Sequence, residues 1–326
     1  MSLKKFITFG ILALCHKAIT APLDGVNSIS TRGSPNVSLE GEAPMPKYHN
    51  LTREYLNTVP LLEFPPHVPA HAPAHLQPRK LRDTAIGGYD ERVVVDKLEY
   101  PYNAMGRLDV LSEVPFNQTN VCSGSLVGPR HVMVARHCVK SDNLQAARKV
   151  KFSPNYFNGT RLEESYVTDA IIPDRIFGGI YCYEANDWAV LVLADRLGDK
   201  YGYLGVKAVD CKTQTKKPLF VCTPSFIRNS TNKTQSHVGY PRDKGWGVPT
   251  LQEESISIRE CHFCAPGSLR TDADGTDGQS GGPLFIMEDG LPWLYGVSST
   301  HYLTNNGFAS GPDLVKAVAA ARKEFP

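Results

Sequence analysis

Short apolar segments alternate with turn-forming residues along most of the chain. The segments are rich in Val, Ile, Tyr and Phe, and clusters of Gly, Pro, Asn and Asp separate them. This pattern predicts β-strands joined by turns. The predicted strands span residues 92–95, 121–127, 131–135, 149–152, 166–172, 188–193, 219–221, 282–287 and 293–298. The sequence has no glycine-rich strand-to-helix fingerprint and no regular strand–helix alternation, so a parallel α/β sheet is not favoured.

The last segment of the chain has a different period. Apolar residues recur there at helical spacing, at Leu314, Val315, Val318, Ala321 and Phe325. They predict an amphipathic C-terminal helix, with Asp313 as its N-cap or first-turn anion. The predicted fold class is therefore all-β with a C-terminal α-helix.

The first 21 residues have the layout of a secretory signal peptide. Lys4 and Lys5 form a basic start, residues 6–15 are apolar, and small residues near 18–21 offer a cleavage site. The apolar run is shorter than the roughly 20 residues that a membrane-spanning helix needs. A buried N-terminal helix is the alternative interpretation. Six Asn-X-Ser/Thr sequons suit a secreted glycoprotein and begin at Asn36, Asn50, Asn117, Asn158, Asn229 and Asn232.

Residues 22–82 differ in composition from the rest. They hold ten of the 24 prolines and no cysteine. Each proline removes a backbone donor and restricts the residue before it, so we expect little helix or sheet here. The stretch ends in the basic cluster 79–82, of the kind that secretory processing proteases cut. We interpret 22–82 as a propeptide and 83–326 as the working domain; a permanent N-terminal linker is the alternative.

Composition and charge exclude several classes of protein. Hydrophobic residues make up 41% of the 326 positions, enough for a sizeable core, so wholesale disorder is excluded. A formal net charge of +2 gives no broad basic field, so we expect no nucleic-acid partner. The one long, nearly uncharged run lies at the extreme N-terminus, so we expect no membrane-embedded segment in the working domain.

Seven cysteines remain once the predicted signal peptide is removed. An oxidising compartment makes disulfides the expected state, and an odd count leaves one thiol over or paired between chains. The pair at Cys261 and Cys264 is also half of a zinc-binding pattern. Zinc would need two more ligands at suitable spacing, so we expect no metal.

The strongest local signal is Gly-Gln-Ser-Gly-Gly-Pro at 278–283. Small residues around Ser280 suit a nucleophile exposed in a tight turn, and Gly278 leaves room for an oxyanion beside the turn. We expect the amides of Gly278 and Ser280 to form an oxyanion hole. An ordinary glycine-rich turn is the alternative.

A serine hydroxyl needs a base, and the base needs an orienting carboxylate. His137 follows the predicted strand 131–135, and a disulfide between Cys122 and Cys138 would fix the loop that carries it. Asp187 lies at the start of a strongly apolar strand, where a half-buried carboxylate is costly unless it is paired. A surface histidine and a strand-start turn residue are the alternatives. The chain order His, Asp, Ser matches one of the known triad arrangements.

At these motifs the chain resembles the chymotrypsin-like serine peptidases, and within them the glutamyl endopeptidase (V8-like) branch. The resemblance rests on residues 122–131, 135–138, 187–191 and 278–283, with further similar segments at 99–102, 202–205 and 239–244. It implies two packed six-stranded antiparallel β-barrels with a C-terminal α-helix and a triad between the barrels. It also implies that His137 is the general base, Asp187 its orienter and Ser280 the nucleophile, and that no cofactor is needed.

Two positions depart from the trypsin-like pattern. Trypsin-like members have Asp directly before the serine, where it pairs with a new N-terminal ammonium; this chain has Gln279, so residues 86–88 are not interpreted as an activation terminus. Arg136 precedes the histidine where a small residue is usual. The substrate-binding candidates are Asp274, Ser299 and His301, and they leave open whether the residue before the cut bond is acidic, basic or other.

The sequence thus predicts a secreted, extracellular serine endopeptidase, made as a zymogen, monomeric, and acting on protein or peptide substrates. A catalytically silent homologue that binds a partner protein through the same cleft is the alternative. A lipase or esterase is not favoured because its histidine would come last in the chain. Besides Cys122–Cys138, we expect the pairs Cys211–Cys222 and Cys261–Cys264, with Cys182 left over.

Overall fold

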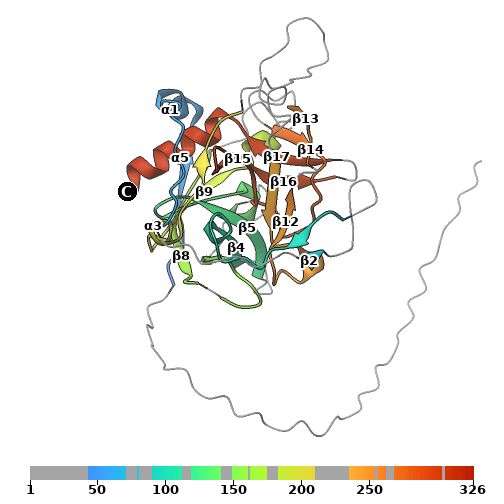
Figure 1. Ribbon diagram of the computed structural model, residues 1–326. Helices are drawn as coiled ribbons and strands as arrows, with labels where there is room; N and C mark the ends of the chain where they lie inside the picture. The colour runs from blue at the N-terminus through green and yellow to red at the C-terminus, as the bar shows by residue number, and fades with distance from the viewer. Residues whose placement is uncertain are drawn as a thin grey trace, which may run out of the picture. The chain divides into compact units, whose positions relative to one another are not determined.

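The computed structural model describes residues 43–70, 79–80, 90–111, 119–140, 149–160, 162–174, 183–209, 235–253, 256–261, 268–302 and 305–326. All of them belong to one compact unit, residues 43–326 (Figure 1). The predicted signal peptide, the predicted strand 219–221, Cys182 and the predicted pairs Cys211–Cys222 and Cys261–Cys264 lie outside the residues whose side chains are described.

The first sheet closes into a barrel. Its strand order is β1-β8-β7-β4-β5-β6-β9, and β8 also pairs with β9. The strands are β1 (Lys47–Leu51), β4 (Met105–Leu111), β5 (Thr119–Gly128), β6 (His131–Val134), β7 (Lys149–Pro154), β8 (Ser165–Pro173) and β9 (Ala189–Leu193). The six strands β4–β9 are antiparallel to their neighbours and form the barrel, whereas β1 adds to β8 in parallel. Every residue of β9 is buried, as its uninterrupted apolar sequence predicts.

The second sheet holds the remaining strands that the structure describes. Its order is β13-β14-β17-β16-β15-β11-β12-β3-β2, with β10 paired to β16. The strands are β2 (Arg79–Lys80), β3 (Val93–Val94), β10 (Gly205–Val206), β11 (Gln235–Gly239), β12 (Thr250–Glu253), β13 (Ile258–Cys261), β14 (Ser268–Thr271), β15 (Pro283–Glu288), β16 (Leu291–His301) and β17 (Asn306–Ser310). The all-β prediction is confirmed: a closed six-stranded antiparallel barrel, a second sheet and a C-terminal helix.

The helices of the described residues are short apart from the last one. They are α1 (Arg53–Thr58), α2 (Arg136–Val139), α3 (Leu197–Tyr201) and α5 (Pro312–Glu324), with 3-10 turns η1 (Tyr102–Ala104), η3 (Glu184–Asn186) and η4 (Arg242–Lys244). The predicted C-terminal helix is confirmed as α5. Its N-cap is Gly311, and Asp313 is an anion in the first turn. Within the described ranges, no helix has both the length and the apolar character that crossing a membrane requires.

Residues 43–70, which we call the N-terminal arm, pack onto the barrel and α5. Strand β1 pairs with β8 from Lys47 opposite Asp169 to Leu51 opposite Pro173, and Leu56 of α1 is fully buried. Figure 1 shows α1 beside α5, where Arg53 Nη1 lies 2.5 Å from Asp313 Oδ2.

The expectation that residues 22–82 would form little regular structure is wrong for the N-terminal arm. The prolines of the arm leave residues 47–59 free, so β1 and α1 keep their backbone donors. The side chain of Thr52 caps α1 by accepting a hydrogen bond from Tyr55 N. Beyond α1, Phe64 and His67 form isolated bridges to Val206 and Tyr203. The predicted domain boundary at residue 82 stays a prediction.

Candidate active site

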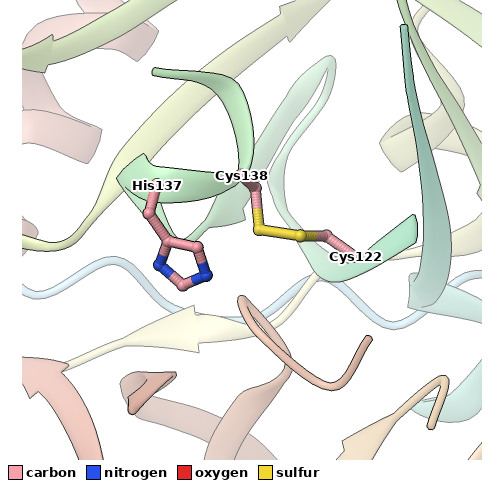
Figure 2. Close-up of side chains that lie close together, drawn as sticks. All are labelled: Cys122, His137 and Cys138. Carbon is pink, nitrogen blue, oxygen red and sulfur yellow. A yellow bond between two sulfur atoms is a disulfide. The ribbon is translucent and has the colours of Figure 1, made fainter. Parts of the chain in front are cut away.

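His137 is held at the end of β6 by a one-turn helix and a disulfide. β6 ends at Val134, Ala135 is extended, and α2 then carries His137. The predicted Cys122–Cys138 disulfide is confirmed and links β5 to this helix, next to the imidazole (Figure 2). The loop that presents the imidazole is therefore fixed covalently to a neighbouring strand.

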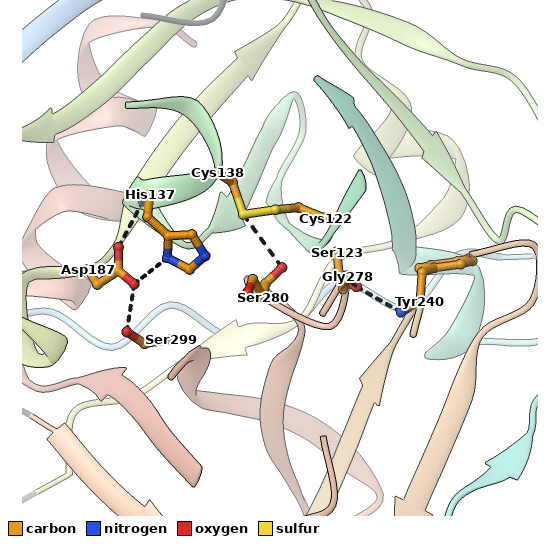
Figure 3. The surroundings of a disulfide bond; sticks show 9 residues. All are labelled: Cys122, Ser123, His137, Cys138, Asp187, Tyr240, Gly278, Ser280 and Ser299. Carbon is orange, nitrogen blue, oxygen red and sulfur yellow. Dashed lines mark hydrogen bonds and ion pairs between the residues drawn. A yellow bond between two sulfur atoms is a disulfide. The ribbon is translucent and has the colours of Figure 1, made fainter. Parts of the chain in front are cut away.

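Asp187 directs its carboxylate at His137 from the start of β9. Only 1% of its surface is exposed. Oδ1 accepts the backbone N–H of His137 at 2.8 Å, and Oδ2 lies 2.6 Å from His137 Nδ1. Because a carboxylate only accepts, Nδ1 carries the proton, which leaves Nε2 with its lone pair free to act as a base. Oδ2 also accepts the Ser299 hydroxyl at 2.6 Å (Figure 3).

The buried carboxylate changes the acidity of the imidazole. Burial of His137 disfavours its protonated form, but the negative charge of Asp187 and the hydrogen bond to it outweigh that effect. The pKa of His137 is therefore raised above its ordinary value. A histidine in this position is a stronger base than a free imidazole.

Ser280 lies in the turn before β15, and the barrel holds this turn from the other sheet. The carbonyl of Ser280 accepts Ser123 N at 2.8 Å, and Ser123 Oγ donates to the Gly278 carbonyl at 2.8 Å. A Cβ added at Gly281 would lie 2.8 Å from Ala135 N, so the turn packs directly against the residue that precedes α2. Residues from both sheets therefore meet here.

No hydrogen bond joins the Ser280 hydroxyl to His137 among the described residues. In Figure 3 the His137 ring is drawn between Asp187 and Ser280, and dashed lines join it only to Asp187. Hydrogen bonds of this kind are often long without substrate and shorten when substrate binds. Cys138 Sγ lies 3.7 Å from the Ser280 carbonyl oxygen, which is a contact only, because a disulfide sulfur has no proton to donate.

Two amides of this turn are not used by the described part of the protein. Gln279 N donates to Thr276 O at 3.1 Å and Gly281 N to Ser298 O at 2.7 Å. The amides of Gly278 and Ser280 donate no hydrogen bond within the ranges that the structure describes. Gly278 has a φ of +94°, and a Cβ there would lie 2.3 Å from Tyr240 O, so this conformation requires glycine. Two free donors flank Gln279 where the sequence predicts an oxyanion hole.

The three predicted substrate-binding residues have different environments. Asp274 is 1% exposed, and its Oδ2 accepts Glu91 N at 3.0 Å. Ser299 donates to Asp187, so it belongs to the surroundings of that carboxylate. The ring of His301 packs against Gly275, where a Cβ would lie 2.6 Å from Nδ1. Neither His301 nitrogen meets hydrogen-bond geometry with a described residue, and burial above all lowers its pKa, against contrary effects of Asn306 and Asp277. Their roles in substrate binding stay predictions.

One cluster of metal-type donor atoms occurs among the described residues. It consists of Cys122, His137 and Cys138, whose donor atoms lie within 4.8 Å of one another. The two cysteines are joined in a disulfide, so neither offers a thiolate to a metal. The cluster is therefore a consequence of the disulfide that fixes the histidine.

Two further residues at the site were missed in the sequence. Ser123 joins the turn to the barrel, because its hydroxyl also accepts Tyr240 N at 2.9 Å. Arg92 is buried beside Gln279. Ser123 lies within the motif 122–131, but no spacing rule assigns it a partner more than a hundred residues away. Arg136, which precedes His137 where a small residue is usual, is 4% exposed.

Comparisons with known proteins identify a family for the chain and a fold similar to the one described above. The family model described as Trypsin matches residues 100–322. A curated glutamyl endopeptidase from Bacillus licheniformis is 27% identical over 240 residues, which cover 73% of this chain and 64% of that protein's length. A solved Glu endopeptidase in complex with MPD superimposes with a TM-score of 0.56 at 18% identity, covering 74% of this chain and all of that one. The protease Anisep from Arthrobacter nicotinovorans gives a TM-score of 0.50 at 18% identity, covering 68% and 98% of the two chains.

Proposed function

The chain belongs to the trypsin family of serine peptidases, and on that premise we propose that it is an endopeptidase that cuts peptide bonds through an acyl-enzyme on Ser280. The observation that carries the proposal is the Asp187–His137 pair beside a turn with two unused amides. Such a pair supplies a base, and such a turn supplies both a nucleophile and donors for the developing oxyanion.

The reaction proceeds in two balanced halves. Ser280 Oγ bonds to the carbonyl carbon while its proton passes to His137 Nε2, and the amides of Gly278 and Ser280 receive the oxyanion. The C–N bond then breaks, and His137 returns the proton to the leaving amine. Water attacks the acyl-enzyme in the same way, with its proton taken by His137 and returned to Ser280. One peptide bond and one water thus give one acid and one amine.

Asp187 serves this cycle without changing its own protonation. Its hydrogen bond to Nδ1 holds the tautomer in which Nε2 is the base. Its charge stabilises the imidazolium that forms when Ser280 loses its proton. The bond from Ser299 to the same oxygen fixes the carboxylate in this orientation.

His301 is the residue that receives the side chain before the cut bond, and that side chain is acidic. Asp274 already accepts Glu91 N, whereas neither His301 nitrogen has a hydrogen bond of good geometry to a described residue, and its interaction with Asn306 only partly offsets the lowering of its pKa by burial. Buried polar nitrogens without partners are costly, and a substrate carboxylate supplies both a partner and the charge that favours a protonated ring. The name of the curated glutamyl endopeptidase supports the same preference.

Maturation and location follow the sequence prediction. Residues 1–21 direct secretion, cleavage after residue 82 matures a zymogen, and the product is extracellular and monomeric. Asn50 and Asn158 are exposed sequon positions and suit glycosylation. The N-terminal arm stays bound after cleavage, because β1 and the buried Leu56 join it to the barrel and α5.

The decisive experiment treats the protein cleaved after residue 82, with the N-terminal arm still bound, with a serine-directed phosphonate and, separately, with an unbiased peptide library. Labelling of Ser280, together with hydrolysis that Ser280→Ala abolishes, is expected. Correctly folded protein that neither reacts nor hydrolyses would favour the silent homologue that binds a partner through this site.

The same library tests the preference for acidic residues. Parent enzyme should cut after Glu or Asp, and His301→Gln should lose that preference while retaining slow cleavage elsewhere. Asp274→Asn is the matched control and should keep the acidic preference. Cleavage after Lys or Arg that disappears in Asp274→Asn would instead assign the pocket to Asp274.

A further inference from the structure

A buried arginine from the start of the domain lies against the turn that carries Ser280. Arg92 is 1% exposed and is among the largest fully buried side chains. Its guanidinium makes two hydrogen bonds to Asp90, with Nε to Oδ1 at 2.9 Å and Nη2 to Oδ2 at 3.1 Å. Nη2 also donates to Asp243 Oδ2 at 2.6 Å, and Nη1 donates to Gln279 Oε1 at 2.8 Å. We call these four residues the Arg92 cluster.

The Arg92 cluster stabilises the buried positive charge of the Arg92 guanidinium. A buried guanidinium is tolerated only when its donors are paired and its charge is balanced. Two carboxylates balance the charge of Arg92 and that of Lys244, whose Nζ lies 3.8 Å from both Asp90 Oδ2 and Asp243 Oδ2. The planar fork of arginine reaches Asp90, Asp243 and Gln279 at once, which a lysine ammonium cannot do.

Gln279 connects the Arg92 cluster to the turn that carries Ser280. It stands between Gly278 and Ser280, whose amides are the two unused donors. Its side-chain oxygen accepts both Arg92 Nη1 at 2.8 Å and Thr276 N at 3.0 Å, so one atom fixes both the side chain and the backbone of the turn. Gly239 leaves space for it, because a Cβ there would lie 2.8 Å from Gln279 Cγ.

Arg92 also binds the 240–244 loop, which contacts the same turn, through its hydrogen bond to Asp243. Asp243 lies in η4, and Arg242 N of the same 3-10 turn donates to Asp277 O at 2.7 Å. Upstream, Tyr240 N and the Gly278 carbonyl share the Ser123 hydroxyl. A shift of the guanidinium would therefore act on the turn through Gln279 and through the 240–244 loop together.

We infer that Arg92 is a positioning residue for the proposed oxyanion hole: its guanidinium, acting through Gln279 Oε1, holds the Gly278 and Ser280 amides in the orientation that receives the oxyanion. The inference rests on the proposed function. It is distinct from a purely structural role, in which the cluster would only fasten residues 90–95 to the second sheet. The structural role predicts lost stability, whereas the positioning role predicts lost kcat in protein that remains folded.

The test compares Arg92→Lys, Gln279→Met and the double variant with the parent, each cleaved after residue 82 with the N-terminal arm still bound. Arg92→Lys keeps a cation near Asp90 and Asp243 but gives up the fork to Gln279. Gln279→Met removes the acceptor while leaving Arg92 its two carboxylates. Lys244→Met is the matched control, since Lys244 lies near the same two carboxylates and its recorded ion pairs do not include Gln279.

Four comparisons separate the positioning role from the structural role. Each single variant should lower kcat by about 100-fold, the scale of one lost oxyanion donor, with a much smaller change in KM. The acidic limb of the pH profile should not move, because His137 and Asp187 are untouched. The double variant should be no worse than the more damaged single variant, since the two changes remove one interaction. Hydrogen exchange of the 276–282 amides should be faster, and Lys244→Met should leave all these quantities near the parent values.

Specific outcomes overturn the inference. They are a kcat within threefold of the parent for both single variants, single effects that multiply in the double variant, or unchanged exchange at 276–282. If Arg92→Lys does not fold, Gln279→Met tests the inference on its own by the same criteria. A parent that neither hydrolyses peptides nor labels at Ser280 refutes the proposed function instead, and amide exchange still decides whether Arg92 holds the turn.

Discussion

Replacing Asp187 with asparagine removes one oxygen and one charge from the centre of the proposed site. The carboxylate accepts three hydrogen bonds, from His137 N, His137 Nδ1 and Ser299 Oγ. An asparagine offers one accepting oxygen and one donating amide group. The variant therefore cannot reproduce the pattern in either orientation.

The expected loss of kcat in Asp187→Asn follows from the two orientations that the asparagine amide can take. If the amide oxygen keeps His137 N, the NH₂ group faces Nδ1, which must give up its proton; Nε2 then carries it and cannot accept the proton of Ser280. If the amide flips, two N–H donors face each other where the structure has a 2.8 Å hydrogen bond, at a cost of about 1–3 kcal/mol. The first orientation is therefore favoured. It leaves the wrong tautomer, with an expected loss of about 10⁴ in kcat, or about 5.5 kcal/mol of barrier.

The pH dependence changes as well. The neutral imidazole is the active form, so activity in the parent rises as pH increases through the pKa of His137. That pKa is raised because the charge and the hydrogen bond of Asp187 outweigh burial. The acidic limb of the parent should therefore lie above the ordinary histidine value of about 6.5. In Asp187→Asn only the effect of burial on the pKa of His137 remains, and burial lowers that pKa. The acidic limb of the variant should therefore lie at lower pH than that of the parent.

The assay is kcat/KM for a peptide substrate between about pH 5 and 9, on either side of the histidine range, with active-site titration to count competent enzyme. Asp169→Asn is the matched control, because Asp169 Oδ1 forms a second aspartate–histidine pair with His49 Nε2 at 2.8 Å, between β8 and β1. The control should retain parent activity. An Asp187→Asn enzyme within tenfold of the parent, or an acidic limb that stays in place, would refute the assignment of base and orienter.

Three further changes test the turn, the disulfide and the N-terminal arm. Gly278→Ala brings a methyl group to 2.3 Å from Tyr240 O at a φ of +94°. Its kcat should fall by about 10²-fold or more with a lower Tm, and parent-like kinetics would contradict the oxyanion role. The double variant Cys122→Ser, Cys138→Ser removes a disulfide between residues 16 apart in sequence, and it should lower the free energy of unfolding in urea by about 3 kcal/mol. A loss below about 1 kcal/mol would contradict that stabilisation. Leu56→Ala empties a fully buried position and should cost about 2–5 kcal/mol in thermal unfolding of the full chain, whereas no cost would mean that the arm is not part of the folding unit.

The sequence predicted those strands whose own residues carry the signal. β9 is an unbroken apolar run, and every residue of it is buried. β4, β11, β12 and β14 were not predicted, because they carry polar or charged residues among the apolar ones. In β11 and β12 these polar residues are buried with partners from elsewhere in the fold: His237 lies 3.1 Å from Pro283 O, and Gln252 accepts Asp274 N. A sequence pattern does not contain such partners.

The N-terminal arm shows the same limit. Its prolines set it apart from the rest of the chain in composition. Whether a short proline-free run forms a strand depends on an available edge, and β8 supplies that edge more than a hundred residues later. Composition alone therefore predicted little helix or sheet in the arm, whereas tertiary pairing gave it β1 and α1.

By itself the sequence determined the candidate chemical groups of the proposed site and the residues beside them: the histidine beside Cys138, the aspartate before an apolar strand, and the serine in a glycine-rich turn. Each is a local pattern, set by neighbours within a few residues. Only the tertiary structure decided that Ser123 joins the turn to the barrel, that Ser299 shares the Asp187 carboxylate, and that Arg92 reaches Gln279 across 187 residues of sequence. Hydrogen-bond partners so far apart are brought together by strand order within a sheet and by the packing of the two sheets, and no spacing along the chain records either.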